Sequence, residues 1–299
     1  MTRSDSPHDV ATLGCDTHVH VIGASTSYPM VPERQYTPGP ADCKALQHHL
    51  KQQGLGRVVI VQPSVYGTDN QCLLEALATC APHARGIAVL DRSITANALQ
   101  ALDAQGVRGI RLNFESSANH SADQLQQALQ HWGPRLAPLG WHIQVYAPFE
   151  VTAACASALS ALPVPVVLDH FGLWPALAED SSVLGKHHHT AQQRMLALLD
   201  QGHLYIKLSA SYRLPAFNPS GLHQLAHHLL QRRPDRLLWG SDWPHTNREP
   251  GVHAHAISRY RPIAPHALIQ ERNDWLHTAA LQRSVLIDNP ARLYRFDLP

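Results

Sequence analysis

Residues 57–65 read RVVIVQPSV, a run of branched apolar residues that ends in a polar turn containing a proline. This near-continuous Val and Ile composition is typical of a strand that is buried on both faces, as in a parallel sheet. Seven similar runs occur along the chain. The expected strands are Leu13–Ile22, Arg57–Val65, Ala84–Leu90, Val107–Phe114, Trp141–Tyr146, Val164–Phe171, Leu204–Ala210 and Leu237–Trp243.

The expected strands begin 23 to 44 residues apart, which leaves room for a helix between them. Helices are expected at Ala41–Gln53, Asn70–Cys80, Ser121–Leu136, Val151–Leu162, Thr190–Gln201 and Pro219–Gln231. Eight such units predict an α/β fold of the (β/α)8 TIM barrel type, as a single domain over residues 11–299. A doubly wound open sheet is the alternative, although neither GxGxxG nor GxxxxGK[ST] occurs. Residues 1–10 are expected to form a loose N-terminal tail.

The composition excludes several classes of protein. The 299 residues carry 24 Lys+Arg and 23 Asp+Glu without a charged block, which argues against nucleic-acid and membrane-surface partners. No apolar run is long enough to span a membrane, and the N-terminus lacks the apolar core of a signal peptide. The five cysteines are odd in number and form no CxxC motif. We therefore expect reduced thiols and a cytoplasmic protein, with no indication of the oligomeric state.

The first expected strand ends in the motif DTHVH at residues 16–20. Residues i and i+2 of a strand point to the same side, so His18 and His20 are expected to face one site together. Two imidazoles that share a site can bind one metal ion. The alternative is that both are ordinary strand histidines.

Two further motifs, LDHFG at 168–172 and WGSDWPH at 239–245, end the sixth and eighth expected strands, where barrel active sites lie. The tryptophans around Asp242 would partly desolvate this carboxylate and tune it as a base. Alternatively, Asp242 caps the helix that follows. Other histidine clusters are interpreted as solvent-facing: His48–His49 and His227–His228 in expected helices, and His187–His189 at the start of one.

Taken together, these motifs resemble those of the amidohydrolase superfamily, in its amidohydrolase 2 branch, and are most similar to those of 2-pyrone-4,6-dicarboxylate hydrolases and related lactonases. The matching elements are DTHVHV at 16–21, ERQYTPG at 33–39, VQPSVYGTDN at 61–70, RGIRLN at 108–113, VLDHFG at 167–172, IKLSASYR at 206–213, WGSDWPH at 239–245 and DNPARLY at 288–294. The resemblance covers nearly the whole chain and implies a (β/α)8 barrel, in agreement with the strand count.

The resemblance also implies roles for individual residues. Asp242 would be the general base that activates water, and His170 would bind or polarise the substrate carbonyl. With His18 and His20 they form the implied catalytic set. The residues implied to hold the carboxylates and the carbonyl of the substrate are Tyr36, Ser64, Arg111, Tyr146 and Arg213. A guanidinium pairs bidentately with a carboxylate, so both arginines suit this role, with structural ion pairs as the alternative.

The same resemblance limits the expected metal content. Many amidohydrolases hold two ions with a lysine on the fourth strand and a histidine on the fifth. The corresponding strands here offer Arg111, Asn113, Gln144 and Tyr146. We therefore expect at most one divalent ion, zinc being the best match, with the provisional ligands His18, His20, His170 and Asp242. A metal-independent reaction, as implied by the pyrone dicarboxylate hydrolases, is the alternative.

The expected reaction is the hydrolysis of a small anionic lactone by water that Asp242 activates. The family places a Lys-Arg pair after the 108–113 motif, whereas residues 115–117 here are Glu-Ser-Ser. With one carboxylate contact missing, a monocarboxylated lactone, a sugar lactone or a sulfonated muconolactone fits as well as pyrone dicarboxylate. The alternatives are a metal-dependent nonoxidative decarboxylase, a lactone isomerase of the same branch, and a binding protein on an inactive barrel.

Overall fold

The structure, a computed structural model, describes residues 7–115, 121–175, 183–214 and 217–297. It divides into two compact units, of which the first comprises residues 1–111 and 239–299 and the second residues 112–238. Strands alternate with helices in both units. All eight expected strands are present, and each is shorter than the apolar run that predicted it.

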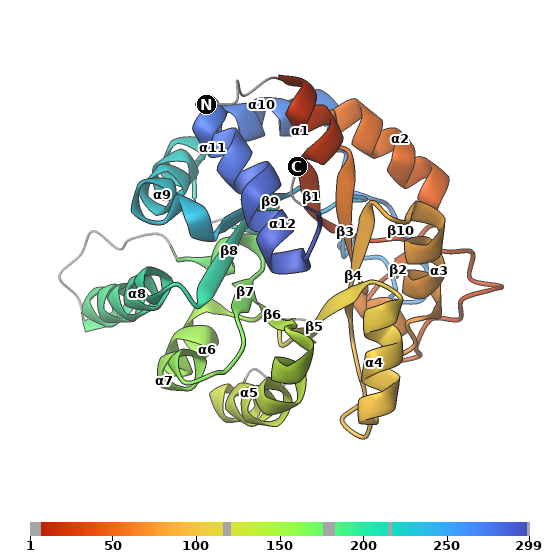
Figure 1. Cartoon of the computed structure of the whole chain (residues 1–299), viewed down its shortest axis with the longest axis horizontal. Coiled ribbons are helices and arrows are strands. Elements are labelled where there is room, and N and C mark those ends of the chain that lie inside the picture. The colour runs from red at the N-terminus through yellow and green to blue at the C-terminus, as the bar shows by residue number, and fades with distance from the viewer. Residues whose placement is uncertain (1–6, 116–120, 176–182, 215–216, 298–299) are drawn as a thin grey trace. The chain divides into compact units, whose positions relative to one another are not determined.

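In the first unit, four strands pair in parallel in the order β1 (Cys15–Val19), β3 (Arg57–Val61), β4 (Ala84–Ala88) and β5 (Val107–Asn113). The helices on the outside of these strands in Figure 1 are α2 (Cys43–Gln53), α3 (Gln71–Cys80) and α4 (Ala96–Ala104). Every residue of β1 and β3 is buried, which explains the Val and Ile composition of β3, whereas β1 buries the polar residues Asp16, Thr17 and His18.

Strand β9 (Leu237–Gly240) is the last of the eight, and the segment that follows it lies beside β1, the first. Val19 and Trp243 form a parallel bridge. The Asp242 N–H donates to the His18 carbonyl at 2.9 Å. A first strand that neighbours the last belongs to a barrel, whereas in a doubly wound sheet the first strand is central and the last lies at an edge. The (β/α)8 prediction is confirmed and the open-sheet alternative is wrong.

In the second unit, β6 (His142–Tyr146), β7 (Val166–Leu168) and β8 (Leu204–Ser209) pair in parallel in this order. The helices of this unit are α5 (Ala122–Leu136), α6 (Phe149–Ala154), α7 (Ala156–Ser160), α8 (Val183–Gln201) and α9 (Pro219–Arg232). The helix expected at 151–162 is therefore divided in two. The division falls at Cys155, whose ψ of 9° departs from helical values.

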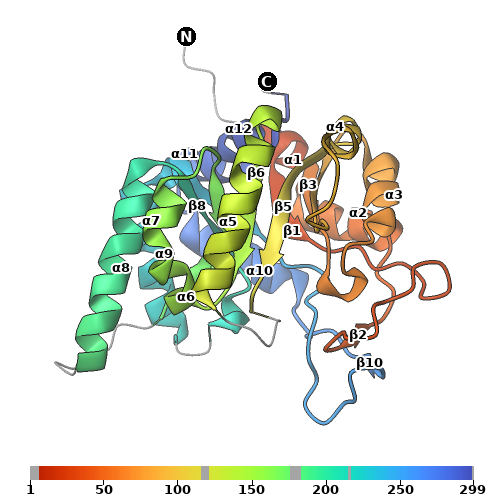
Figure 2. The ribbon, with the colours of Figure 1, turned by 90° about the horizontal axis from the view of Figure 1, so that it is seen from below.

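The remaining α-helices and strands all belong to the first unit: α1 (Pro7–Leu13), β2 (Thr37–Pro38), β10 (Ile257–Ser258), α10 (Pro265–Trp275), α11 (Ala279–Arg283) and α12 (Asn289–Tyr294). Strands β2 and β10 pair in parallel and project together in Figure 2. Their pairing joins the loop after β1 to the segment after β9. The Thr37 hydroxyl adds a second link by donating to the Ala254 carbonyl at 2.7 Å.

Residues 7–10, expected as part of a loose tail, instead belong to α1. Proline suits the first helical position because its missing N–H would have had no partner there. The helix ends where the Gly14 N–H donates to the Val10 carbonyl at 2.8 Å, and the Gly14 carbonyl accepts from the Arg57 N–H at 2.9 Å. The N-terminal segment is thus tied to β3, while residues 1–6 lie outside the described part of the chain.

Among the described residues, none of the helices combines the length and the apolar character needed to cross a bilayer.

Gly240 permits the close contact between the end of β9 and β1. A Cβ at this position would lie 2.6 Å from the His18 Cβ and 2.9 Å from the His18 backbone nitrogen. We expect Gly240→Ala to lower the free energy of unfolding by about 1–3 kcal/mol, as overpacking does, in urea denaturation. Gly39→Ala is the matched control, because its Cβ would meet only Ile257 Cγ2 at 3.8 Å. Equal losses in both variants would contradict the close-contact explanation.

Candidate active site

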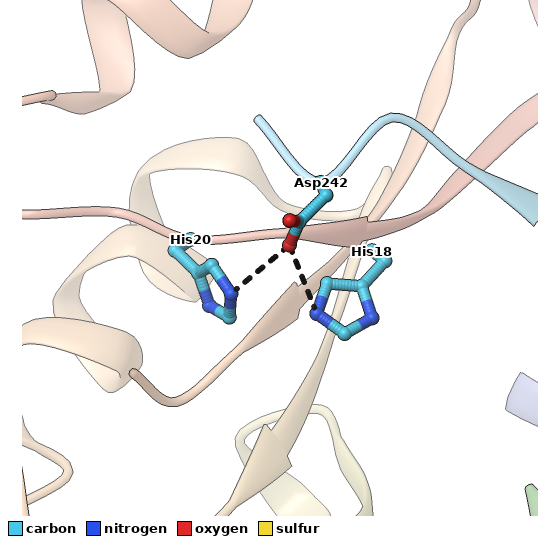
Figure 3. Close-up of side chains that lie close together, drawn as sticks. All are labelled: His18, His20 and Asp242. Carbon is cyan, nitrogen blue, oxygen red and sulfur yellow. Dashed lines mark ion pairs between the residues drawn. The ribbon is translucent and has the colours of Figure 1, made fainter. Parts of the chain in front are cut away.

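Three buried side chains meet at the carboxyl end of β1. His18 and His20 point to the same side, as their spacing predicts, and both face Asp242, which follows β9 (Figure 3). The Nε2 atoms of His18 and His20 each lie 3.6 Å from Asp242 Oδ1. The two imidazole rings are 5.0 Å apart and nearly perpendicular. Because the three side chains are at most 5% exposed, water screens their interactions only weakly.

Asp242 has a backbone conformation that few residues adopt. Its φ of 60° lies in the left-handed region, which costs a residue other than glycine roughly 1–2 kcal/mol. Such strain persists only where the surroundings hold it, and it is common at functional sites. The Asp242 carbonyl accepts from the His245 N–H at 2.7 Å. The next helix, α10, begins only at Pro265, so the alternative that Asp242 caps a helix is wrong.

His20 is fixed in one tautomer by its second ring nitrogen. His20 Nδ1 lies 2.8 Å from the Val61 carbonyl oxygen, which can only accept, so Nδ1 carries the hydrogen. His20 Nε2 therefore presents a lone pair to the carboxylate oxygen of Asp242. Two acceptors that face each other need a proton or a cation between them. A carbonyl that accepts from the far nitrogen is also how metal-binding histidines are commonly oriented.

The donor atoms of this cluster fit a single divalent ion. One ligand atom from each of His18, His20 and Asp242 lies within 4.8 Å of the other two. Two imidazole nitrogens and one carboxylate oxygen are a set that zinc binds, and three protein ligands leave a position for water or substrate. The residues present thus suit the metal that the family resemblance implies.

Three expected substrate-binding residues lie at the carboxyl ends of strands, or in the loops after them, in the first unit. Ser64 begins a 3₁₀ turn (Ser64–Tyr66) directly after β3, and Arg111, near the end of β5, is 6% exposed. Tyr36 is partly buried in the loop between β1 and β2. Burial, with the Tyr36 phenol nearby, raises the pKa of Tyr260, which donates to the Gly39 carbonyl as a neutral phenol.

The other expected site residues lie at the carboxyl ends of strands in the second unit. His170 follows β7, and its Nδ1 lies 2.9 Å from Ser209 Oγ at the end of β8. The Tyr146 and His170 rings are 5.1 Å apart in an edge-to-face contact. Arg213 lies in the turn after β8, with its guanidinium 5.5 Å from the centre of the Tyr212 ring. His170, like Asp242, has a positive φ, of 50°.

A buried lysine beside His170 was missed by sequence reasoning. Lys207 in β8 is fully buried, and its Nζ donates to Gln144 Oε1 at 2.7 Å and lies 3.7 Å from Asp169 Oδ1. Asp169 precedes His170 in the chain. The signal was a single lysine inside an apolar strand run, because a buried ammonium needs an acidic partner.

His49 corrects the expectation that His48–His49 faces solvent. His48 is exposed, but His49 is 4% exposed. It shares the buried face of α2 with Leu46, Leu50 and Gln53. This spacing of three and four residues is the helical pattern that could have revealed it. His189 and His228 are exposed as expected and His227 is partly buried, while the side chains of His187 and His188 lie outside the described ones.

Comparisons with known proteins identify the family. Residues 15–296 match the amidohydrolase family, and the chain belongs to it. A 2-pyrone-4,6-dicarboxylate hydrolase of Comamonas testosteroni is 32% identical over 292 residues, covering 93% of this chain and 89% of the relative. A 4-sulfomuconolactone hydrolase of Rhizobium radiobacter is 31% identical over 294 residues, with the same two coverages of 93% and 89%.

A solved structure supports the same assignment. A probable 2-pyrone-4,6-dicarboxylic acid hydrolase from Acinetobacter baumannii, with citric acid bound, has a TM-score of 0.76 and 28% identity. The match covers 95% of this chain and 100% of that one. The chain is therefore an amidohydrolase-type enzyme with the (β/α)8 barrel fold.

Proposed function

We propose that this enzyme opens the ring of a small anionic lactone by adding water. The observation that carries the proposal is the buried carboxylate of Asp242, held 3.6 Å from both His18 Nε2 and His20 Nε2. Active sites of (β/α)8 barrels lie at the carboxyl ends of the strands, which is where these residues stand. The two curated relatives described above are both lactone hydrolases by name.

In the proposed reaction, Asp242 takes a proton from water as the water oxygen bonds to the lactone carbonyl carbon. The tetrahedral intermediate collapses as the bond from that carbon to the ring oxygen breaks. The departing oxygen takes this proton back from Asp242, and the product is a hydroxy or keto acid. Negative charge develops on the carbonyl oxygen, so imidazole donors stabilise the intermediate. We assign this role to His170, whereas the Nε2 atoms of His18 and His20 face Asp242, so these two residues would act on the carbonyl oxygen through a bound cation.

Substrate orientation falls to the remaining proposed site residues. Arg111 and Arg213 offer guanidinium groups for the substrate anion, which they would pair in a fixed geometry. Tyr36, Ser64 and Tyr146 offer hydroxyl groups for the carbonyl and the carboxylate. Because the family resemblance implies cations where this chain has Glu115, we favour a lactone with one anionic group, either a carboxylate or a sulfonate.

A bound divalent ion is part of the proposal. His18, His20 and Asp242 would hold it, with His170 as the provisional fourth ligand, and zinc is the best match for this set. When bound, such an ion polarises a carbonyl and makes water a better nucleophile at neutral pH. Oδ1 of Asp242 faces both imidazoles, so we assign the proton transfer to Oδ2.

A cytoplasmic location also belongs to the proposal, supported by the five cysteines, which form no disulfide.

A screen of lactones with a pH indicator, followed by product mass measurement, tests the reaction itself. We expect acid release and a product heavier than the substrate by one water. The panel should include pyrone dicarboxylate, sulfomuconolactone, monocarboxylated lactones and sugar lactones. A product of unchanged mass would indicate an isomerase instead, and loss of CO2 from the carboxylated panel members would indicate a decarboxylase.

Asp242→Asn tests the general base. The amide keeps the shape of the carboxylate but cannot accept a proton from water, so we expect kcat to fall by about 10²- to 10⁴-fold. Substrate binding, measured by calorimetry with the inactive variant, should persist. A variant that keeps more than about a tenth of wild-type turnover would rule out the base role, because that loss is too small for a missing base.

Metal analysis tests the proposed ion. Protein purified without a His-tag should contain no more than one divalent ion per chain, and His20→Ala should contain less because it removes a ligand. Chelation should lower turnover, and adding zinc back should restore it. Two ions per chain would contradict the proposal, and full activity in metal-free protein would remove the ion from the reaction.

A further inference from the structure

Next to the catalytic cluster of His18, His20 and Asp242 lies a second group of buried polar residues, formed by Asp16, His49 and Ser241. Asp16 and Ser241 are fully buried, and His49 is 4% exposed. Asp16 belongs to β1, Ser241 precedes Asp242, and His49 comes from helix α2 on the outside of the strands. None of the three has a role in the proposed reaction.

Asp16 binds the backbone on both sides of the catalytic cluster. Its Oδ1 accepts from the His18 N–H at 3.1 Å and from the Ser241 N–H at 3.0 Å. One carboxylate oxygen therefore fixes a backbone amide of β1 and a backbone amide of the segment after β9. These two amides belong to a site histidine and to the residue next to Asp242.

Ser241 extends the same restraint past Asp242. Its Oγ accepts from the Trp243 N–H at 3.0 Å. The Asp242 N–H donates to the His18 carbonyl, so the amides of all three residues from 241 to 243 are held. This is the segment in which Asp242 takes its left-handed conformation, and these bonds offset the strain.

His49 completes the group from the helix side. Its Nε2 lies 3.4 Å from Asp16 Oδ2 and 3.1 Å from Ser241 Oγ. An ionised carboxylate can only accept, so the hydrogen on this nitrogen points to Asp16 and Ser241. The His49 ring also stacks on Trp243, with centroids 5.7 Å apart and planes 27° apart. His49 thereby compensates a buried carboxylate and supports the turn that carries Asp242.

We propose that Asp16, His49 and Ser241 form a positioning network that holds Asp242 against His18 and His20. The network touches no reacting atom and acts through the backbone of residues 241–243. This inference rests on the general-base role of Asp242 in the proposed function. Misplacing a catalytic group lowers turnover more than substrate binding, because the geometry matters most in the transition state.

Variants of His49 test the network on the screened lactone with the highest turnover. His49→Phe keeps a ring to stack on Trp243 but removes the donor, and His49→Gln keeps an N–H donor at a similar reach. His48→Phe, at the exposed neighbouring position of α2, is the matched control. We expect His49→Phe to lower kcat by about 10²-fold with KM nearly unchanged. His49→Gln should recover about a tenth or more of wild-type kcat, because the donor is what counts.

Hydrogen exchange of residues 239–245 supplies a readout that needs no substrate. This segment should exchange faster in His49→Phe than in the wild type and be unchanged in His48→Phe, because the network ties its amides. The proposal is overturned if His49→Phe keeps wild-type kcat and wild-type exchange. It is also overturned if His49→Gln is as impaired as His49→Phe, because the loss of turnover would then not depend on the N–H donor.

Ser241→Ala covers the case in which His49→Phe does not fold. It removes one hydroxyl, and we expect kcat to fall while the urea unfolding curve stays close to that of the wild type. A folded Ser241→Ala with unchanged kcat and unchanged exchange overturns the network. Asp242→Asn separates this failure from that of the proposed function. Loss of activity in Asp242→Asn but not in the network variants overturns the network alone, whereas an active Asp242→Asn overturns the base role.

Discussion

The close approach of residues 240–243 to β1 is the contact on which the rest of the site depends. At Gly240 there is room only for a hydrogen atom opposite His18. Beyond it, the Asp242 N–H and the His20 N–H donate to facing carbonyls at 2.9 and 2.8 Å. The same contact joins the first strand to the last and brings a carboxylate from one end of the chain against two imidazoles from the other.

Buried charge constrains both units in a similar way. Asp16 and Asp169 precede site histidines, and both carboxylates are shielded from water. Each has a basic partner from another element, His49 for Asp16 at 3.4 Å and Lys207 for Asp169 at 3.7 Å. Removing the lysine of the Asp169–Lys207 pair would leave an uncompensated buried charge, typically at a cost of about 3–5 kcal/mol. In the second unit Gln144 accepts from Lys207, so this side chain is engaged in the core.

Much of the fold could be predicted from local sequence because strands that are buried on both faces must be apolar along their length. The eight runs located the strands, but not their ends, since residues such as Pro63 and Ser64 continue the run without pairing. Helix α4 was missed because its Ala-rich segment buries only Leu99 and shows little contrast between its faces. Helix α1 was missed because its place depends on a hydrogen bond between Gly14 and Arg57, which are distant in sequence.

For the site, the sequence by itself determined which side chains are available and, through the i, i+2 rule, that His18 and His20 share a side. It also placed Asp242 and His170 at strand ends. Only the tertiary structure decided that Asp242 meets both imidazoles, that Val61 fixes the tautomer of His20, and that His49 turns inward. The physical reason is range: periodicity reports the face on which a side chain lies, whereas hydrogen bonds and compensation of buried charge depend on elements far apart in the chain.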